Sequence, residues 1–335
     1  MAILKKIFSI FIRVAISIIL LILLFRQADE QSLLAIIKNV NKPLLLLAFL
    51  VFFLTYCLGL YRWVMLLKAV KIDLPLKRVI TSFSGGIFFS LFLPSTIGGD
   101  FLRSVDLSVH TKKPKEVIAT IFLDRLSGYI GLVILAVWAM FLGWKILEDR
   151  SVLISLGIII GLLVIVLLLL FNKFLFSKIN RFLKSPNAGK IRDLISDLHE
   201  EIHLFRGKPK VVAKNILVSI VIQAIPPLAF YIVALSLGVK INLAYFFIFI
   251  PIIGAITLLP ISIGGLGLRD ASTIFFFAKV GVGKNLAFAM SLLNFSFILF
   301  YGAVGGLIYV LTVHNRRLQR NQPSGIRQTN PQKIP

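Results

Sequence analysis

Long apolar runs, separated by short polar and basic segments, make up most of this chain. Crossing a bilayer as a helix takes about 20 apolar residues. The predicted spans are Ile3–Phe25, Leu44–Leu67, Val117–Gly143, Ser151–Phe171, Val211–Leu237 and Lys284–Thr312. Shorter or interrupted apolar segments lie between them, at Val79–Ile97, Leu243–Ile263 and Ala271–Val282. The chain has 58% hydrophobic residues and a mean hydropathy of +0.94, so it is more apolar than soluble globular domains usually are. The pattern predicts an all-α polytopic membrane protein.

One short phrase occurs twice. The chain is LPSTIGGDFLR at Leu93–Arg103 and LPISIGGLGLR at Leu259–Arg269, so the first residues, 93 and 259, are offset by 166 residues. Each phrase interrupts an apolar segment with a proline, which lacks a donor N–H, and a pair of glycines, which loosen the backbone. Broken apolar segments at corresponding places in two halves are typical of a transporter's binding site.

The basic residues predict how the chain crosses the membrane. The net charge is +23, and Lys and Arg collect in cytoplasmic loops of membrane proteins, so a nucleic-acid partner is not expected. We place on the cytoplasmic side the N-terminus, the tail, and the loops Lys68–Arg78, Lys112–Lys115 and Asn172–Lys210. This placement requires both phrases to lie in re-entrant hairpins, the first entering from the cytoplasm and the second from outside. The expected location is the cytoplasmic membrane, with both termini inside.

Each half then holds three spans and one hairpin. Because three is odd, the second half is inverted relative to the first. The predicted span starts agree, since positions 44 and 211, and positions 117 and 284, are each offset by 167 residues. We expect a single membrane domain over residues 1–315, with repeat one at about 3–143 and repeat two at about 151–312, then a disordered basic cytoplasmic tail at 316–335.

The glycine pairs of the two phrases are candidate anion sites. Gly98 with Gly99, and Gly264 with Gly265, would each open a helix whose N-terminal N–H groups and dipole favour an anion such as phosphate. Arg103 and Arg269 follow about one turn later and would add bidentate phosphate contacts. The alternative is that these glycines only allow helices to pack closely.

A second group of charges follows the first phrase. Asp100, Asp106, Asp124 and Arg125 lie in or beside apolar segments, where charges usually face a partner or a cavity. Asp124 and Arg125 would pair with Arg103 or Asp106 across the hairpin. Either a salt-bridge lock or a role with substrate or protons explains them, and Asp270 beside Arg269 would act likewise.

Three polar residues in spans have structural interpretations. Gln223 and Asn294 are expected to form hydrogen bonds between helices. Arg62 lies between Tyr61 and Trp63 and is interpreted as part of an aromatic interface anchor.

Signals for an enzyme are weak. The HEEIH stretch at His199–His203 fits a zinc pattern, but it lies in a predicted amphipathic helix, Lys190–Phe205, where a solvated face explains it better. No metal and no cofactor is expected. The single cysteine, Cys57, excludes an intrachain disulfide.

Three motifs in order resemble a known family. PSTIGGDFLR at Pro94–Arg103, EVIATIFLDRLSG at Glu116–Gly128 and PISIGGLGLRD at Pro260–Asp270 are similar to the flippase-like membrane domain of the lysylphosphatidylglycerol synthetase family. The resemblance covers about residues 5–315 and implies movement of aminoacylated phosphatidylglycerol between leaflets in the full-length proteins. The soluble aminoacyltransferase domain of those proteins, and the further spans that precede it, have no counterpart in this chain, so it is not expected to make the lysyl lipid itself. The resemblance implies varied lipid substrates among stand-alone members, so the lysyl identity does not carry over.

The sequence therefore favours a lipid flippase or lipid-binding translocator over an enzyme. The substrate would be a phospholipid or a polyprenyl-phosphate lipid, whose phosphate Arg103 and Arg269 would hold. Two alternatives stay open. One is an integral membrane enzyme, or an accessory subunit of lipid or glycan modification, with Asp100, Asp106 or Asp124 as acid or base. The other is a scaffold that recruits a synthetase through its basic loop. Membrane lipids with phosphate-bearing headgroups are the expected partners, together with a lipid-modifying enzyme or glycosyltransferase.

Overall fold

The computed structural model describes residues 15, 17–20, 22–23, 30–92, 97–143, 154, 157–158, 161, 205, 207–257, 262 and 265–321. Those residues form an all-helical bundle, in which four helices are long and apolar enough to cross a membrane. These four candidate spans are α3 (Lys42–Ala69), α6 (Pro114–Gly143), α10 (Pro209–Ser236) and α13 (Lys284–Asn321). The all-α membrane fold predicted from the apolar runs is confirmed.

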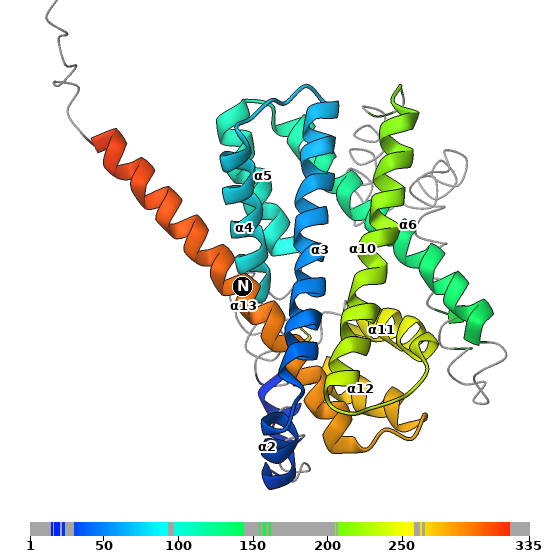
Figure 1. The fold of residues 1–335 in the computed structure, drawn as a ribbon. Coiled ribbons are helices and arrows are strands. Elements are labelled where there is room, and N and C mark those ends of the chain that lie inside the picture. The colour runs from blue at the N-terminus through cyan, green and yellow to red at the C-terminus, as the bar shows by residue number, and fades with distance from the viewer. Residues whose placement is uncertain are drawn as a thin grey trace, which may run out of the picture.

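Two of these helices, α3 and α10, lie side by side at the centre of the bundle (Figure 1). Both begin with a proline at the first turn, where its missing N–H costs no helical hydrogen bond. Asn41 caps α3, because its side chain accepts a hydrogen bond from Leu44 N at 3.1 Å. Helices α13 and α6 run obliquely on either side of this pair.

The shorter helices form two pairs, one at each end of the bundle. Helices α4 (Leu76–Phe92) and α5 (Ile97–Thr111) pack against each other beside α13. Helices α11 (Leu243–Thr257) and α12 (Leu268–Ala278) occupy the opposite end, close to α2 (Glu30–Lys38) in the view of Figure 1. The α4–α5 pair and the α11–α12 pair therefore lie toward opposite ends of the bundle.

The two halves make matching contacts. Helix α4 packs on α13 of the other half, as α11 packs on α6, and α5 packs on α6, as α12 packs on α13. The helix starts keep the expected spacing, since α3 begins at residue 42 and α10 at residue 209, an offset of 167 residues. These contacts are those that an internal repeat would make, although the inverted orientation stays a prediction.

An aromatic core joins the halves at the end that holds α11 and α12. Phe230 and Phe246 pack against Phe277, with ring centroids 5.8 Å and 5.0 Å away. Between the halves, Tyr301 of α13 stacks on Phe49 of α3 at 4.7 Å and donates a hydrogen bond to the Phe49 carbonyl at 2.8 Å. These contacts fix the crossing of α3 and α13 and so place the helices that carry the charged residues.

Several expectations differ from the structure or lie beyond it. The span expected at Lys284–Thr312 agrees with the candidate span Lys284–Val313, but helix α13 continues to Asn321, so residues 316–321 of the tail expected to be disordered are helical. The spans predicted at Ile3–Phe25 and Ser151–Phe171, the amphipathic helix Lys190–Phe205 and the HEEIH stretch lie almost entirely outside the described residues. Residues 322–335 of the predicted tail lie outside them as well.

Candidate functional site: a charged cavity between five helices

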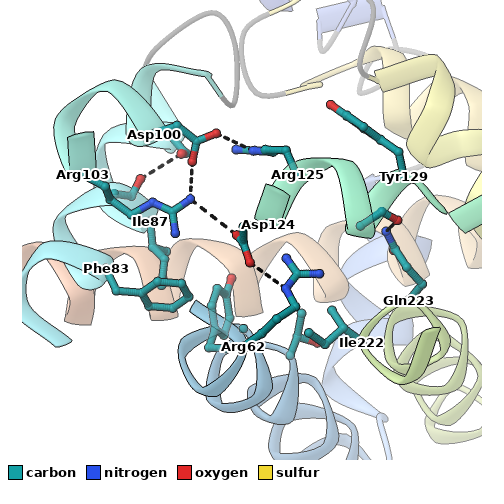
Figure 2. Close-up of a pocket in the computed structure, with 16 residues that line it drawn as sticks. Arg62, Phe83, Ile87, Asp100, Arg103, Asp124, Arg125, Tyr129, Ile222 and Gln223 are labelled. Carbon is teal, nitrogen blue, oxygen red and sulfur yellow. Dashed lines mark hydrogen bonds and ion pairs between the residues drawn. The ribbon is translucent and has the colours of Figure 1, made fainter. Parts of the chain in front are cut away.

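A cavity of about 260 Å³ lies among helices of both halves, inside the bundle (Figure 2). Helices α3, α4, α5, α6 and α10 supply its walls. Its charged lining residues are Arg62, Asp100, Arg103, Asp124 and Arg125. Four of them were predicted from the sequence as site residues, and the fold brings those four together.

The five charges form one continuous network. Asp100 accepts hydrogen bonds from Arg103 Nη2 through Oδ1 and from Arg125 Nε through Oδ2. Arg103 Nη2 also lies 3.8 Å from Asp124 Oδ2, as Figure 2 shows. The predicted pairing of Asp124 with Arg103 across the hairpin is therefore confirmed.

The far end of the network is Arg62. Its Nε donates to Asp124 Oδ1 at 2.7 Å, and its Nη1 donates to Ser219 Oγ of α10, also at 2.7 Å. The interpretation of Arg62 as an interface anchor is wrong: the residue is 9% exposed, and its neighbour Trp63 is fully buried. An arginine at this depth needs a carboxylate partner because an unpaired charge there is costly, and Asp124 supplies it.

Close helix contact at the first phrase holds Asp100 and Arg103 in place. Helix α5 begins at Ile97, within the phrase, as predicted. A Cβ added at Gly99 would clash with the Gly86 carbonyl and the Ser90 hydroxyl of α4. Gly99 therefore has the packing role that was the alternative to anion binding. The Arg103 guanidinium lies over the rings of Trp63 and Phe83, at 4.7 Å and 5.4 Å.

The second phrase builds a different arrangement. Arg269 is not among the residues that line the cavity. Its Nη2 donates to Asp270 Oδ1 at 2.7 Å, its Nε donates to Ser291 Oγ at 3.1 Å, and its guanidinium lies over Phe295 at 4.3 Å. Asp270 is fully buried and also accepts from Gly267 N at 3.0 Å, which caps α12.

Two glycines of the second phrase, Gly265 and Gly267, lie in the turn before α12. Gly265 and Gly267 have φ of +74° and +77°, in the left-handed region that glycine adopts readily. Gly264 lies outside the described residues. Residues of the first phrase thus line a cavity, whereas Arg269 of the second phrase forms a buried ion pair with Asp270 that carries no net charge.

Asp106 belongs neither to the charged network of the cavity nor to the Arg269–Asp270 pair. It accepts a hydrogen bond from Arg78 Nη2 of α4 at 2.9 Å, and His110 contacts the same guanidinium. Of the two partners expected for Asp124 and Arg125, Arg103 is the one that the structure shows, and Asp106 pairs with Arg78 instead.

Neutral polar groups complete the cavity wall. Gln223 of α10 donates through Nε2 to the Gly128 carbonyl of α6 at 2.9 Å, the interhelical hydrogen bond expected from the sequence. Thr55, Tyr56, Ser90 and Tyr129 also line the cavity. Among the described residues Thr55 Oγ1 has no hydrogen-bond partner, although it is buried. Asn294 Nδ2 has none either, so the bond predicted for that group is not seen.

The spacing of polar and small residues along α3 could have predicted which face of this helix lines the cavity. Thr55, Gly59 and Arg62 are spaced at i, i+4 and i+7 and share one face of an otherwise apolar helix. All three line the cavity. No group of three or more His, Cys, Asp or Glu side chains arranged to hold a metal ion occurs in the described part of the chain.

Comparison with known proteins agrees with this architecture. A model of the lysylphosphatidylglycerol synthase TM region matches residues 10–305. A UPF0104 membrane protein of Pyrococcus horikoshii is 26% identical over 332 residues, covering 92% of this chain and 98% of that protein. A UPF0104 membrane protein of Methanothermobacter thermautotrophicus is 24% identical over 280 residues, covering 77% of this chain and 82% of that protein. Since the family model spans most of the chain, including both phrases and the cavity, this membrane protein belongs to the lysylphosphatidylglycerol synthase transmembrane-region family.

Proposed function

We propose that this protein is a lipid flippase or lipid-binding translocator of a cytoplasmic membrane, and that it moves a phosphate-bearing lipid between leaflets. The observation that carries the proposal is the arginine-rich cavity among apolar helices. Three guanidinium groups and two carboxylates line it, so one positive charge is in excess. Charged residues within membrane segments are costly, and those that face a cavity are by default candidates for a substrate pathway.

The phosphate of a lipid headgroup would bind at Arg125 and Arg103. The Arg125 side chain is 32% exposed, whereas that of Arg103 is 7% exposed, so an entering anion would meet Arg125 first. Arginine is suited to this role because its planar fork forms bidentate hydrogen bonds with phosphate. The acyl or prenyl chains would stay among the lipid-facing helices.

The matching contacts of the two halves support an inverted repeat, in which the α4–α5 and α11–α12 pairs enter the membrane from opposite faces. In such transporters the substrate site lies at the interface of the repeats. The cavity fits this description, since α10 of the second half closes it with Gln223 and Ile222. The basic loops favour cytoplasmic termini.

Leaflet exchange in liposomes tests the proposal. Purified protein is reconstituted into vesicles that contain trace nitrobenzoxadiazole-labelled phosphatidylglycerol, and dithionite then bleaches the outer leaflet. We expect bleaching beyond the outer-leaflet fraction with wild type, and a large loss of it in Arg103→Gln with Arg125→Gln. Lys68→Gln on α3 is the control, because it removes one exposed positive charge outside the cavity.

The same assay can reject the proposal. If wild-type vesicles bleach no further than protein-free vesicles, for phosphatidylglycerol and for every other phosphate lipid tried, the protein is not a translocator. If the double variant exchanges lipid as fast as wild type, the cavity is not the headgroup site.

A further inference from the structure

Resting on the proposed function, we infer that the phosphate of an entering lipid operates a latch at the cavity. The latch is the ion pair between Asp100 of α5 and Arg125 of α6, which holds the α4–α5 pair against α6. Phosphate binding by the cavity arginines releases Asp100, and the end of the α4–α5 pair that carries Asp100 then moves away from α6. Every headgroup that the proposed function allows carries this phosphate, so the latch does not depend on the rest of the headgroup.

Asp100 lies between the two arginines that the proposed function assigns to phosphate. Its Oδ1 accepts from Arg103 Nη2 and its Oδ2 accepts from Arg125 Nε, as Figure 2 shows. A phosphate held by both arginines would therefore lie where this carboxylate lies, or directly against it. Asp100 is 8% exposed, and two negative charges this close repel each other strongly where little water screens them. Phosphate and Asp100 therefore compete for the same guanidinium groups.

Release of Asp100 would move two helices rather than one side chain. Asp100 lies in the first turn of α5, directly after Gly99, which lies so close to the Gly86 carbonyl of α4 that no Cβ fits between them. Nearer the other end of the two helices, Arg78 Nη2 of α4 and Asp106 Oδ1 of α5 are 2.9 Å apart. Helices α4 and α5 are thus joined at two places and would move as one unit.

The two ends of this unit are held by different contacts. At the end that carries Arg78, which we call the pivot end, Val79 and Leu107 are buried in an apolar cluster with Trp63 of α3 and Val117 of α6. At the end that carries Asp100, which we call the latch end, ion pairs join the unit to α6. A close-packed apolar core resists movement, whereas an ion pair can exchange one anion for another. The unit would therefore turn about its pivot end.

The contact of α4 with α13 would allow this movement. Phe88 and Leu91 of α4 lie directly over Gly306 and Gly302 of α13, so apolar side chains pack on glycine backbone. Apolar contacts are non-directional, and a small shift of α4 along α13 would keep most of the buried area. The ion pair with α6 is then the contact that decides whether the latch end opens.

Distances between paired spin labels test the latch. In a Cys57→Ser background, labels at Phe101→Cys of α5 and Ile134→Cys of α6 report the latch end. Labels at Val109→Cys of α5 and Ile118→Cys of α6 report the pivot end. All four side chains are exposed, so the labels disturb no core contact. Delipidated protein in dodecyl maltoside, a detergent without phosphate, is titrated with phosphatidylglycerol or with diacylglycerol of the same acyl chains.

We expect phosphatidylglycerol to lengthen the distance at the latch end by about 2 Å or more, the size of a typical helix shift. Diacylglycerol should leave this distance unchanged, and the distance at the pivot end should stay constant with both lipids. Asp100→Asn should give the longer distance without any lipid, because the charge that holds Arg125 is gone. Asp73→Asn, at an exposed carboxylate outside the cavity, is the control and should match wild type.

The outcomes separate this inference from the proposed function. If phosphatidylglycerol leaves the latch end in place while the same protein exchanges this lipid between leaflets in vesicles, the latch is overturned and the translocator proposal stands. Equal lengthening with diacylglycerol would show that phosphate is not the trigger, and equal movement at the pivot end would show that the unit does not turn about it. A wild-type distance in Asp100→Asn would overturn the role of the ion pair. Exchange of no lipid by wild type would overturn the proposed function, and the latch with it.

Discussion

Arg62 of α3 and Asp124 of α6 form an ion pair, with Nε and Oδ1 2.7 Å apart, in the wall of the cavity. Their side chains are only 11% and 7% exposed, so solvent contributes little to balancing either charge. Asp124 also faces Arg103, which makes this pair the link between the central helices and the α4–α5 pair. Changes at Arg62 should therefore affect both stability and the position of Arg103.

Removing one member of this pair should cost more than removing both. We expect Arg62→Met to lower the free energy of unfolding by about 3–5 kcal/mol, because Asp124 loses its nearest partner. Arg62→Met combined with Asp124→Leu should recover part of that loss. Denaturant unfolding in detergent micelles measures the single variants Arg62→Met and Asp124→Leu and the double variant. A double variant whose loss equals the sum of the two single losses would contradict the pairing.

Gly99 should not tolerate a methyl group. A Cβ there would meet the Gly86 carbonyl and the Ser90 hydroxyl, so α5 would have to move away from α4. We expect Gly99→Ala to lower the free energy of unfolding by about 1–3 kcal/mol and to slow lipid exchange, because Asp100 and Arg103 would move with α5.

Gly254→Ala is the matched control for that substitution. It lies in α11, and a Cβ there meets no atom within 4 Å. Its stability should equal that of wild type or rise slightly, since alanine favours helix over glycine. Equal effects of the two substitutions, measured by thermal unfolding, would argue against close contact between α4 and α5.

The ion pair of the second phrase should be structural. Asp270→Asn leaves Arg269 without its carboxylate, and we expect it to lower the free energy of unfolding by about 3–5 kcal/mol. Lipid exchange per folded protein should not change, because neither residue lines the cavity. Asp73→Asn, at an exposed carboxylate, is the control and should leave both quantities unchanged. Slower lipid exchange per folded protein with Asp270→Asn would place this pair in the lipid path.

Single-cysteine labelling tests the inverted topology. In a Cys57→Ser background, Lys115→Cys should react with a membrane-impermeant maleimide only from the cytoplasmic side, and Lys240→Cys only from outside. Both side chains are exposed in the structure, so burial would not block the reagent. Labelling of both cysteines from one side would contradict the inverted repeat.

The sequence predicted the apolar helices and most of the charged site, because both depend on local patterns. Long apolar runs give the spans, and the repeated phrase identified Arg103 and Asp100 before any helix was placed. Asp124 and Arg125 were found as charges in an apolar run, which the membrane tolerates only with partners.

The sequence did not reveal which charges meet. Arg62 lies between two aromatic residues, a local pattern that also fits an interface anchor, and only the packing of α3 on α6 distinguishes the two. The two arginines of the repeated phrase were given the same role, phosphate binding. The structure separates them, because Arg269 is held by its neighbour Asp270 and by Ser291, and the contact with Ser291 requires α12 to lie against α13.

The central claim, that the cavity is the path of the headgroup, can be tested by filling it. Thr55→Cys in a Cys57→Ser background is labelled with a bulky, membrane-permeant maleimide, and mass spectrometry establishes the labelled fraction. Wild type labelled at Cys57 is the control, because that thiol is exposed on the same helix and does not line the cavity. Exchange of phosphatidylglycerol between leaflets should fall in proportion to labelling at position 55 and stay unchanged after labelling at Cys57. Full exchange by protein whose position 55 is completely labelled would contradict the account.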